Sequence, residues 1–531
     1  QDQYDRFNEI GITRVTQISS ALTIKEKKVE EDKLVYGQSR FILVSPERFL
    51  IRSFREVLQY YQFMFGQINQ VIIDECHCVS EWGHEFRPAY LSVSRIVKER
   101  TSRLDSSAPL IALTGTASSV VLADVRRELG LEDPNCLVQA KSMGRPELTL
   151  KCALIKQDQK ISYLQKQVSE FIASNKNKTD GVLIFTDAVN GRKGVYSIAS
   201  NLSAVLDEEI RCYAGQKPKE LNPKDFIWAQ DSGWDEIKRK NQEEFINSFD
   251  PSYRILVSTK AFGMGVDKPS IRRVIHYMTP SSPESYYQEV GRAGRDKQPS
   301  EGLILFSDEN SEIVDKILSP DIDISTATKI YEDFDKFNKW APGDFLGAFY
   351  FHKSAFGTPE QEVKNLVIVL NQIRRNLINN YSPVLRWDLI AIDKDGNAVE
   401  YSLVRLLHMG VLKDYTKDYK ARICFYELND EWININHNIE KLKDFYANKF
   451  EFYRSRYQIL KQKNPINNFT FERIDELESS VASVFIDYVY DQIERKRRQA
   501  SRQMLEMVRI GVKQPEEFEK NLLLYLQTSE S

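Results

Sequence analysis

The sequence lacks the features of a membrane, secreted or disulfide-bonded protein. No apolar run reaches the ~18 residues that a membrane-spanning helix requires, and the first residues show no basic segment followed by an apolar one. The six cysteines are scattered and form neither a disulfide framework nor paired CxxC zinc spacing. We therefore expect an intracellular protein without membrane contact: cytoplasmic or nucleoid-associated, or nuclear in a eukaryote.

The chain also lacks a strong charge of either sign. Its 73 Lys and Arg and 76 Asp and Glu leave a net charge of −3 over 531 residues, so any contact with nucleic acid must come from local basic patches. Hydrophobic residues at 42% and charged residues at 28% are typical of globular domains and exclude extended disorder. At roughly 150 residues per domain, the length favours three or four domains.

Short apolar runs alternate with longer amphipathic stretches up to about residue 318. The runs are residues 40–44 (RFILV), 71–73 (VII), 110–113 (LIAL), 181–185 (GVLIF), 255–257 (ILV), 274–276 (VIH) and 302–306 (GLILF). Amphipathic stretches such as 195–206 and 237–249 separate them, which predicts buried parallel strands joined by helices. In such sheets the functional residues lie at the carboxyl ends of the strands. A break near Glu147 predicts two α/β lobes.

Two carboxylates follow the run 71–73, in the segment VIIDECH. Mg²⁺ is usually held through one or two carboxylates and phosphate oxygens, so Asp74 is the expected metal partner, acting through bound water. Glu75 is then placed to orient or deprotonate an attacking water. An acidic surface turn after a strand is the alternative for this segment alone.

A second segment, residues 285–296 (SYYQEVGRAGRD), contains two arginines three residues apart. We expect Arg292 and Arg295 to lie on one helix face, where small neighbours let a partner lobe approach closely. Charge that develops on a transferred phosphoryl group calls for such a pair, and a solvated basic turn is the alternative. Both arginines are candidate catalytic residues, and Gln288 is a candidate nucleotide contact.

The segment 257–269 (VSTKAFGMGVDKP) follows another strand-like run. Its glycines, Gly265 among them, permit the backbone to approach a ligand closely. Asp267 is placed to accept a ribose hydroxyl or to couple two lobes, and Thr259 is a candidate DNA contact. A mobile glycine loop is the alternative.

Taken in order, DECH, LTGTAS (113–118), STKAFGMGVDKP and QEVGRAGRD resemble motifs II, III, V and VI of superfamily 2 helicases. SEWGHEFRPAY (80–90) resembles the aromatic-rich loop of RecQ helicases, SPER (45–48) resembles motif Ib, and the DQ and GI pairs within residues 1–12 resemble the region of motif Ia. The resemblance implies ATP and Mg²⁺ as cofactors, with ATP between two RecA-like lobes and His77 among the nucleotide contacts. It also implies 3′→5′ movement on DNA. An RNA helicase and a DNA-binding scaffold with an inactive motor are the rival interpretations.

The aromatic loop also has a physical interpretation. Trp82 and Phe86 offer flat faces on which bases stack. His84 and Arg87 offer polar contacts to phosphate or to the nucleotide pocket, and a buried plug of aromatic residues is the alternative. The neighbouring run 76–78 (CHC) is not expected to bind zinc, because consecutive ligands cannot easily face one tetrahedral ion.

Two features of the family are missing from the sequence. No GxxxxGK[ST] phosphate loop occurs, and helicases of this type place that loop upstream of the DQ segment. We interpret the first lobe as truncated, with a degenerate helicase as the alternative, and expect residues 1–531 alone to bind DNA without hydrolysing ATP at a helicase-like rate. Only Cys424 lies beyond the arginine pair, so the four-cysteine zinc platform of many RecQ proteins is absent and no zinc is expected.

Smaller units are predicted beyond the second lobe. A helical segment 365–380, a helix 399–412 that ends at Gly410, and two short strands within 414–428 resemble a winged helix, with a protein-docking β-module as the alternative. Its candidate phosphate contacts are Arg405, Lys413, Lys417, Lys420 and Arg422. Residues 439–526 predict a helical tail, whose basic stretch 493–502 is either a DNA contact or a solvated helix face.

The predicted fold is therefore α/β, with two RecA-like parallel-sheet lobes, the first truncated, followed by a winged-helix-like module and a helical tail. The expected domains are lobe 1 (1–147), lobe 2 (148–318), a helical connector (319–375), the winged-helix-like module (376–428) and the tail (429–531). The segment 217–237 looks like an insertion and, with the C-terminal helices, is a candidate surface for protein partners. DNA, as a single strand and as a duplex junction, is the expected main partner.

Overall fold

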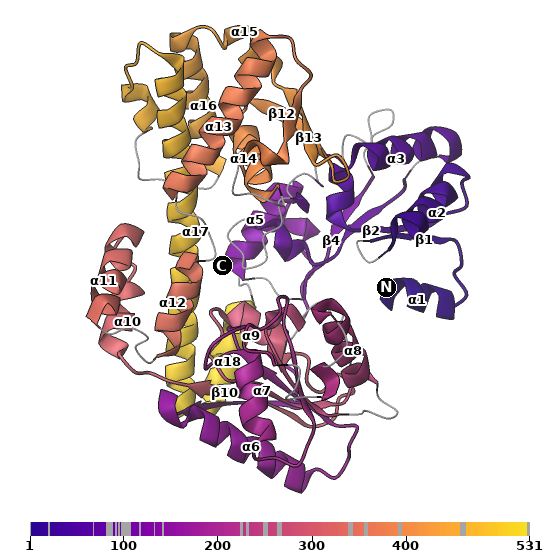
Figure 1. Ribbon diagram of the computed structural model, residues 1–531, viewed down its shortest axis with the longest axis vertical. Coiled ribbons are helices and arrows are strands. Elements are labelled where there is room, and N and C mark those ends of the chain that lie inside the picture. Colours follow the sequence, from indigo (N-terminus) through magenta and orange to yellow (C-terminus); the bar gives the residue numbers. More distant parts are fainter. Residues whose placement is uncertain are drawn as a thin grey trace. The chain divides into compact units, whose positions relative to one another are not determined.

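The computed structural model of the chain describes residues 2–19, 22–66, 68–80, 89, 90, 93, 96, 108–115, 118–131, 133–140, 143–222, 227–229, 233–247, 253–262, 268–337, 343–354, 359–390, 396–456 and 464–527. The chain forms two compact units, and each is described by itself (Figure 1). The first unit contains residues 1–114, 124–132 and 356–493, and the second contains residues 115–123, 133–355 and 494–531.

A six-stranded parallel sheet forms the centre of the second unit. Its strand order is β5-β10-β9-β6-β8-β7, and all neighbouring strands pair in parallel. The strands are β5 (Leu148–Leu154), β6 (Gly181–Phe185), β7 (Ile210–Tyr213), β8 (Ile255–Ser258), β9 (Ile271–His276) and β10 (Ser300–Phe306). This sheet confirms the α/β class predicted from the sequence.

Alternate residues of the strands pack on opposite faces of this sheet. On β6, Leu183 and Phe185 belong to one buried cluster, whereas Val182 and Ile184 belong to another. The first cluster includes residues of α8 (Trp234–Ile246), α9 (Pro283–Val290), α10 (Ser311–Ile317) and α18 (Pro515–Leu526), and the second includes residues of α6 (Lys160–Ser174) and α7 (Val195–Ser203). Burial on both faces explains why the central strands are continuous apolar runs.

A buried ion pair fixes the connector helix α12 (Asp344–Ser354), which follows α11 (Ile324–Phe337), to this lobe. Asp344 accepts hydrogen bonds from Lys160 Nζ at 2.6 Å and from Thr279 Oγ1 at 2.7 Å. Lys160 Nζ also donates to Tyr277 O at 3.0 Å. Both charged side chains are fully buried, so loss of either would leave the other unpaired in the interior.

The first unit begins with two pairs of parallel strands. β1 (Val15–Ile18) pairs with β2 (Phe41–Val44), and β3 (Val71–Ile73) pairs with β4 (Leu110–Ala112). The helices around them are α1 (Asp2–Glu9), α2 (Ile24–Val35), α3 (Arg52–Phe65) and the part of α5 (Ser119–Leu129) that starts at Asp124. A capping box begins α2, because Thr23 Oγ1 accepts the Glu26 N–H while the Glu26 carboxylate accepts the Thr23 N–H.

The predicted winged-helix-like module follows in the same unit. Its elements are α13 (Pro359–Ile378), β11 (Val384–Arg386), α14 (Asn397–His408), β12 (Leu412–Asp418) and β13 (Ile423–Leu428), with the antiparallel sheet order β11-β13-β12. Gly410 has a φ of 75°, which glycine adopts without strain, and the backbone turns there from α14 into β12. The strand β11 was not predicted.

The module packs against α3 within this unit. The buried guanidinium of Arg55 on α3 donates to the carboxylate of Asp414 and, at 3.2 Å, to Tyr415 O. Just before α3, Ile51 forms a β-bridge with Lys417 of β12. The module is therefore attached to the first lobe by side-chain and backbone contacts.

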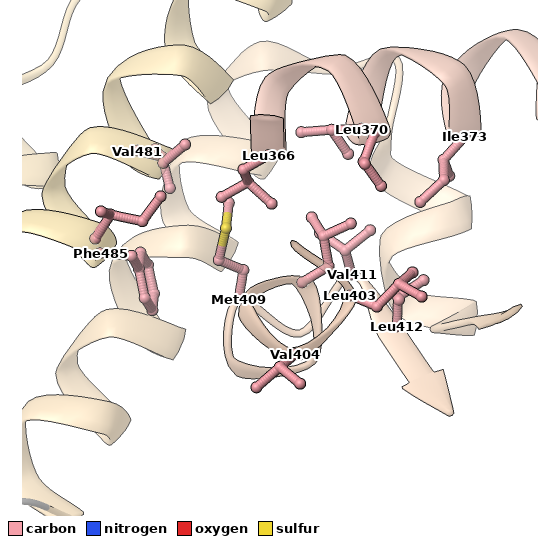
Figure 2. Packing of buried hydrophobic residues seen from close by; sticks show 14 of the residues in the cluster. Leu366, Leu370, Ile373, Leu403, Val404, Met409, Val411, Leu412, Val481 and Phe485 are labelled. Carbon is pink, nitrogen blue, oxygen red and sulfur yellow. The ribbon is translucent and has the colours of Figure 1, made fainter. Parts of the chain in front are cut away.

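Helix α14 is enclosed by its neighbours. Figure 2 shows buried side chains of the cluster around it: Leu366, Leu370 and Ile373 of α13, Leu403 and Val404 of α14, Met409, Val411 and Leu412 after it, and Val481 and Phe485 of α17. Asn397 is the sole exposed residue of α14. The helices α15 (Asp430–Ile435), α16 (Ile439–Arg456) and α17 (Ile474–Lys513) form the predicted helical tail together with α18.

Among the helices of the described residues, none has both the length and the apolar character needed to cross a bilayer.

Candidate functional site

The two predicted carboxylates follow the carboxyl end of β3 in the first unit. The pairing of β3 with β4 continues beyond both strands, because Leu113 N–H donates to Ile73 O at 2.8 Å and Cys76 N–H donates to Leu113 O at 2.9 Å. In the turn between Ile73 and Cys76, Glu75 has a φ of 49°. This value lies in the left-handed region, which is strained for a residue that has a side chain. Asp74 and Glu75 are both exposed, so their carboxylates are accessible at this edge.

Neighbouring groups orient the carboxylate of Asp74. Its Oδ1 accepts the Glu75 N–H at 2.9 Å, and its Oδ2 accepts a hydrogen bond from Gln3 Nε2 at 3.1 Å. An exposed and oriented carboxylate fits a water-mediated contact with Mg²⁺, which prefers oxygen ligands. Gln3 is not among the site residues predicted from the sequence, although the DQ segment that contains it was the available signal.

His77 connects the carboxylates with the LTGTAS segment. Its Nδ1 lies 3.0 Å from Thr114 Oγ1 and 3.2 Å from Glu75 Oε2. A protonated Nδ1 can donate to either oxygen, so the ring is placed to restrain Glu75. The nucleotide contact predicted for His77 stays a prediction, since these contacts are with protein groups.

The cysteines beside the carboxylates are buried. Burial raises the pKa of Cys76 to about 11, so its thiol is protonated near neutral pH. Cys78 is buried too. Within the described ranges, no set of three or more His, Cys, Asp or Glu side chains is arranged to hold a metal ion. Both thiols are thus placed in the interior of the first unit.

The arginine pair follows α9 in the second unit. The helix ends just before Gly291, and a turn continues through residues 291–296. The prediction that Arg292 and Arg295 share a helix face is therefore wrong: Arg292 is only 8% exposed, whereas Arg295 is exposed. Gly294 has a φ of 63°, a left-handed conformation that a helix cannot continue through. One guanidinium thus packs into the lobe while the other faces outward.

Arg145 holds this arginine turn in place. Its Nη1 donates to Gly291 O at 2.7 Å and its Nη2 donates to Gly294 O at 2.8 Å. Its Nε donates to Glu147 Oε1 at 2.7 Å. In the sequence, Arg145 marked only a boundary between lobes, because no local pattern links it with carbonyls 146 and 149 positions away.

Replacing Arg145 by alanine is expected to lower the free energy of unfolding of the second unit by about 2 kcal/mol, because two carbonyls lose a charged donor. Thermal and urea unfolding followed by circular dichroism measure the change. Arg192→Ala, at an exposed position of the same unit, is the matched control and should leave stability unchanged. Equal stability of the two variants would show that the turn does not depend on Arg145.

Other contacts anchor α9, which also carries the partly buried Gln288. Glu289 Oε2 lies 2.9 Å from Nε2 of His276, a buried residue at the end of β9. Tyr287 Oη donates to Met143 O at 2.5 Å. The position of the arginine turn is therefore set from β9 and from the segment before β5. The nucleotide contact of Gln288 stays a prediction.

Thr259 lies just beyond the carboxyl end of β8. Its N–H donates to Tyr213 O at 3.2 Å, and its carbonyl oxygen accepts the Ser258 hydroxyl at 2.7 Å. The side chain is largely buried, and its DNA contact stays a prediction. The remaining predicted site residues lie outside the described residues: Gly265 and Asp267 of the glycine segment, and Trp82, His84, Phe86 and Arg87 of the aromatic loop.

The described part of the segment 217–237 is attached to its own lobe. Glu220 Oε1 accepts the Gly191 N–H at 2.8 Å, and Trp234 Nε1 donates to Ala214 O at 3.1 Å. Side chains of this segment also join the buried cluster of α6 and α7. The segment is therefore part of the lobe, and its role toward protein partners stays a prediction.

Two predicted phosphate contacts of the winged-helix-like module are buried in ion pairs. Arg405 Nε donates to Glu362 Oε1 at 2.7 Å, and Lys417 Nζ donates to Glu400 Oε2 at 2.5 Å. Both cations are 4% exposed, and a cation must face solvent to reach a DNA phosphate. We therefore correct Arg405 and Lys417 to structural residues. Lys413 forms an exposed ion pair with an aspartate of α15 and remains a candidate phosphate contact.

The basic stretch 493–502 of α17 contains arginines that are buried in the protein. Within the second unit, the Arg498 guanidinium donates to Ile317 O at 3.2 Å and to Ile322 O at 2.9 Å. Arg497 and Arg498 are 5% and 4% exposed. At these two positions the stretch is neither a solvated face nor a DNA contact, because the side chains are packed against the protein.

Known helicases are similar to this chain in sequence. The family described as DEAD/DEAH box helicase matches residues 1–125, and the helicase conserved C-terminal domain matches residues 159–297. ATP-dependent DNA helicase RecQ of Haemophilus influenzae is 30% identical over 318 residues, which are 60% of this chain and 44% of that protein. Probable ATP-dependent DNA helicase RecS of Bacillus subtilis is 30% identical over 318 residues, 60% of this chain and 56% of that protein. The chain thus spans about half the length of these relatives.

Solved structures of helicases are similar as well. The DEAD-box helicase Mss116 bound to ssRNA and UDP-BeF has a TM-score of 0.44 at 14% identity, over 72% of this chain and 69% of that chain. Mycobacterium smegmatis helicase Lhr bound to ssDNA and AMP-PNP has a TM-score of 0.39 at 15% identity, over 84% of this chain and 50% of that chain. In sequence, the matched family regions contain both the carboxylates and the arginine turn, whereas Arg145 lies between them.

Proposed function

We propose that this chain, a RecQ-like superfamily 2 helicase by its sequence matches, is the motor of an ATP-dependent DNA helicase. One observation supports the proposal: the first matched region contains an exposed pair of carboxylates, and the second contains a turn with two arginines. Asp74 and Glu75 follow β3 in one domain, and the arginine turn follows α9 in the other. Carboxylates for metal and water, and arginines for phosphate charge, are what such a reaction requires.

In the proposed reaction, water attacks the γ-phosphorus of ATP and the bond to the β–γ bridging oxygen breaks, which yields ADP and phosphate. Glu75 orients the water and accepts its proton, and His77 restrains Glu75 through the contact of 3.2 Å. Asp74 would hold the Mg²⁺ that accompanies ATP, and the ion would supply positive charge to the phosphate oxygens. Arg292 and Arg295 offset the negative charge that develops on the phosphoryl oxygens.

Hydrolysis drives movement along DNA in this proposal. Two of the relatives are named as DNA helicases, which supports DNA over RNA as the track. The resemblance of the motif set to RecQ helicases supports 3′→5′ movement and unwinding of a duplex. The exposed Lys413, Lys420 and Arg422 are the described phosphate contacts that we retain. Thr259, whose side chain is largely buried, stays a candidate DNA contact, and protein partners of the segment 217–237 remain part of the proposal.

Single-stranded DNA is expected to stimulate phosphate release by the full-length protein about tenfold, a lowering of the barrier by ~1.4 kcal/mol, whereas RNA of the same sequence has little effect. Steady-state phosphate release with each polymer measures both effects. Glu75→Gln, assayed in parallel, detects any contaminating ATPase. Equal stimulation by RNA would identify an RNA helicase, and DNA binding without any phosphate release would identify a DNA-binding scaffold.

A further inference from the structure

The C-terminal helix lies on the same sheet face as α9. Phe518, Leu522 and Leu526 of α18 belong to the buried cluster that also contains Tyr286 and Val290 of α9. The rings of Phe518 and Tyr286 are tilted against each other, with centroids 5.5 Å apart. Apolar packing of this kind holds two helices together without fixing the direction of any one side chain.

The hydroxyl group of Tyr525 fixes the direction of one side chain in this packing. Tyr525 Oη donates to Glu284 Oε1 at 2.7 Å, and both residues belong to the second unit. Burial, and after it the Glu284 carboxylate, raises the pKa of Tyr525, so the phenol stays protonated and keeps donating at physiological pH. Glu284 lies in the first turn of α9.

Helix α9 is short enough for its first turn to affect the arginines. The helix has eight residues, and the arginine turn begins directly after it. Near its end, Glu289 contacts His276 and Tyr287 contacts Met143 O. At its first turn, the charged side chain of Glu284 is fixed by Tyr525. If the N-terminal end of so short a helix changes its tilt, the arginine turn at the other end therefore shifts as well.

We propose that Tyr525 is a positioning residue for the arginine turn, because its hydroxyl ties α9, through Glu284, to the C-terminal helix. The proposal rests on the ATPase function proposed above, since the turn carries Arg292 and Arg295. Tyr525 itself touches no reacting atom. The C-terminal helix thereby belongs to the motor, and its inner face is not a surface for DNA or a protein partner.

Tyr525→Phe tests the proposal because it removes the hydroxyl and keeps the packed ring. In the full-length protein we expect kcat for DNA-stimulated ATP hydrolysis to fall about tenfold, as for the loss of one hydrogen bond to a charged group. KM for ATP and the affinity for DNA should stay near the wild-type values. Glu284→Gln should retain most of the activity, since its amide oxygen still accepts from the phenol, whereas Glu284→Ala should lose as much as Tyr525→Phe.

Lys520→Ala is the matched control on the exposed side of α18, where Lys520 pairs with Glu517 of the same helix. It should behave as wild type in both kcat and KM. Equal losses in Lys520→Ala and Tyr525→Phe would overturn the proposal. A fall in kcat of Tyr525→Phe that comes with an equal rise in KM for ATP would overturn it too, by showing a loss of nucleotide binding instead of turn geometry.

Amide hydrogen exchange gives a readout that needs no ATP. Tyr525→Phe should speed exchange across residues 283–296 about tenfold and leave α6, on the other sheet face, unchanged. If the wild-type protein hydrolyses no ATP, the proposed function fails, while the exchange measurement still decides whether Tyr525 fixes the turn. Unchanged exchange at residues 283–296, or an equal increase in α6, would refute the role of Tyr525.

Discussion

Glu75→Gln in the full-length protein is expected to lower ATP hydrolysis by roughly 10²-fold or more while ATP still binds. Glutamine has nearly the same shape as glutamate but cannot accept the proton of the attacking water. The contacts that orient Asp74, from Gln3 and from the backbone N–H at position 75, are preserved by this change. Metal-assisted binding of the nucleotide should therefore persist after the water is no longer activated.

Single-turnover phosphate release and titration with a fluorescent ATP analogue separate these two effects. Glu56→Gln is the matched control, since Glu56 is an exposed carboxylate of the same unit that pairs with Arg52 on the surface of α3. It should hydrolyse ATP at the wild-type rate. Weaker ATP binding with unchanged turnover in Glu75→Gln would contradict the assignment and make Glu75 a nucleotide-binding residue.

Arg295→Ala is expected to lower kcat about 10³-fold with little effect on stability. Arg295 is exposed in the turn after α9, so its removal leaves no cavity. Arg292 is 8% exposed, and Arg292→Ala should therefore reduce thermal stability as well as kcat. The two arginines, three residues apart in one motif, should thus be distinguishable by unfolding measurements.

Lys297→Ala provides the control for both arginine variants, because Lys297 is exposed in the same stretch of chain. Its kcat and its melting temperature should match those of the wild type. A kcat for Arg295→Ala within a small factor of the control would exclude Arg295 from the reaction and leave Arg292 as the sole arginine that neutralises phosphate charge.

The central strands of the second lobe are predictable from the sequence, whereas its edges are not. The strands β6 and β8, and the last residues of β9 and β10, are flanked by strands and covered on both faces, so they read as apolar runs. Arg272 and Arg273 interrupt the first half of β9. The edge strands β5 and β7 carry charged residues. Lys151 of β5 pairs with Glu301, and Arg211 of β7 pairs with Glu244 at 2.6 Å. A short run that contains such charged residues has no clear hydrophobic pattern. The sequence therefore does not distinguish an edge strand of this kind from a loop.

Contacts between residues that are distant in the sequence determine which side chains are buried, and local motifs do not predict these contacts. The motifs identify the carboxylates and the arginines, but Arg145 reaches the arginine turn from 146 positions away. Glu362 pairs with Arg405 across 43 positions, and Glu400 pairs with Lys417 across 17. Basic residues in a predicted helix or wing therefore look available to DNA until the packing of the module is known.

The enclosure of α14 bears on how the proposed helicase motor would treat different DNA sequences. Reading a sequence directly requires a helix that enters the major groove and presents side chains to base edges. Asn397 is the sole exposed residue of α14, so the helix presents no fully exposed face. Duplex contact by this module would then run through the sugar–phosphate backbone, whose charge is the same at every step. Such a module would give the proposed motor no preferred place to stop along the DNA.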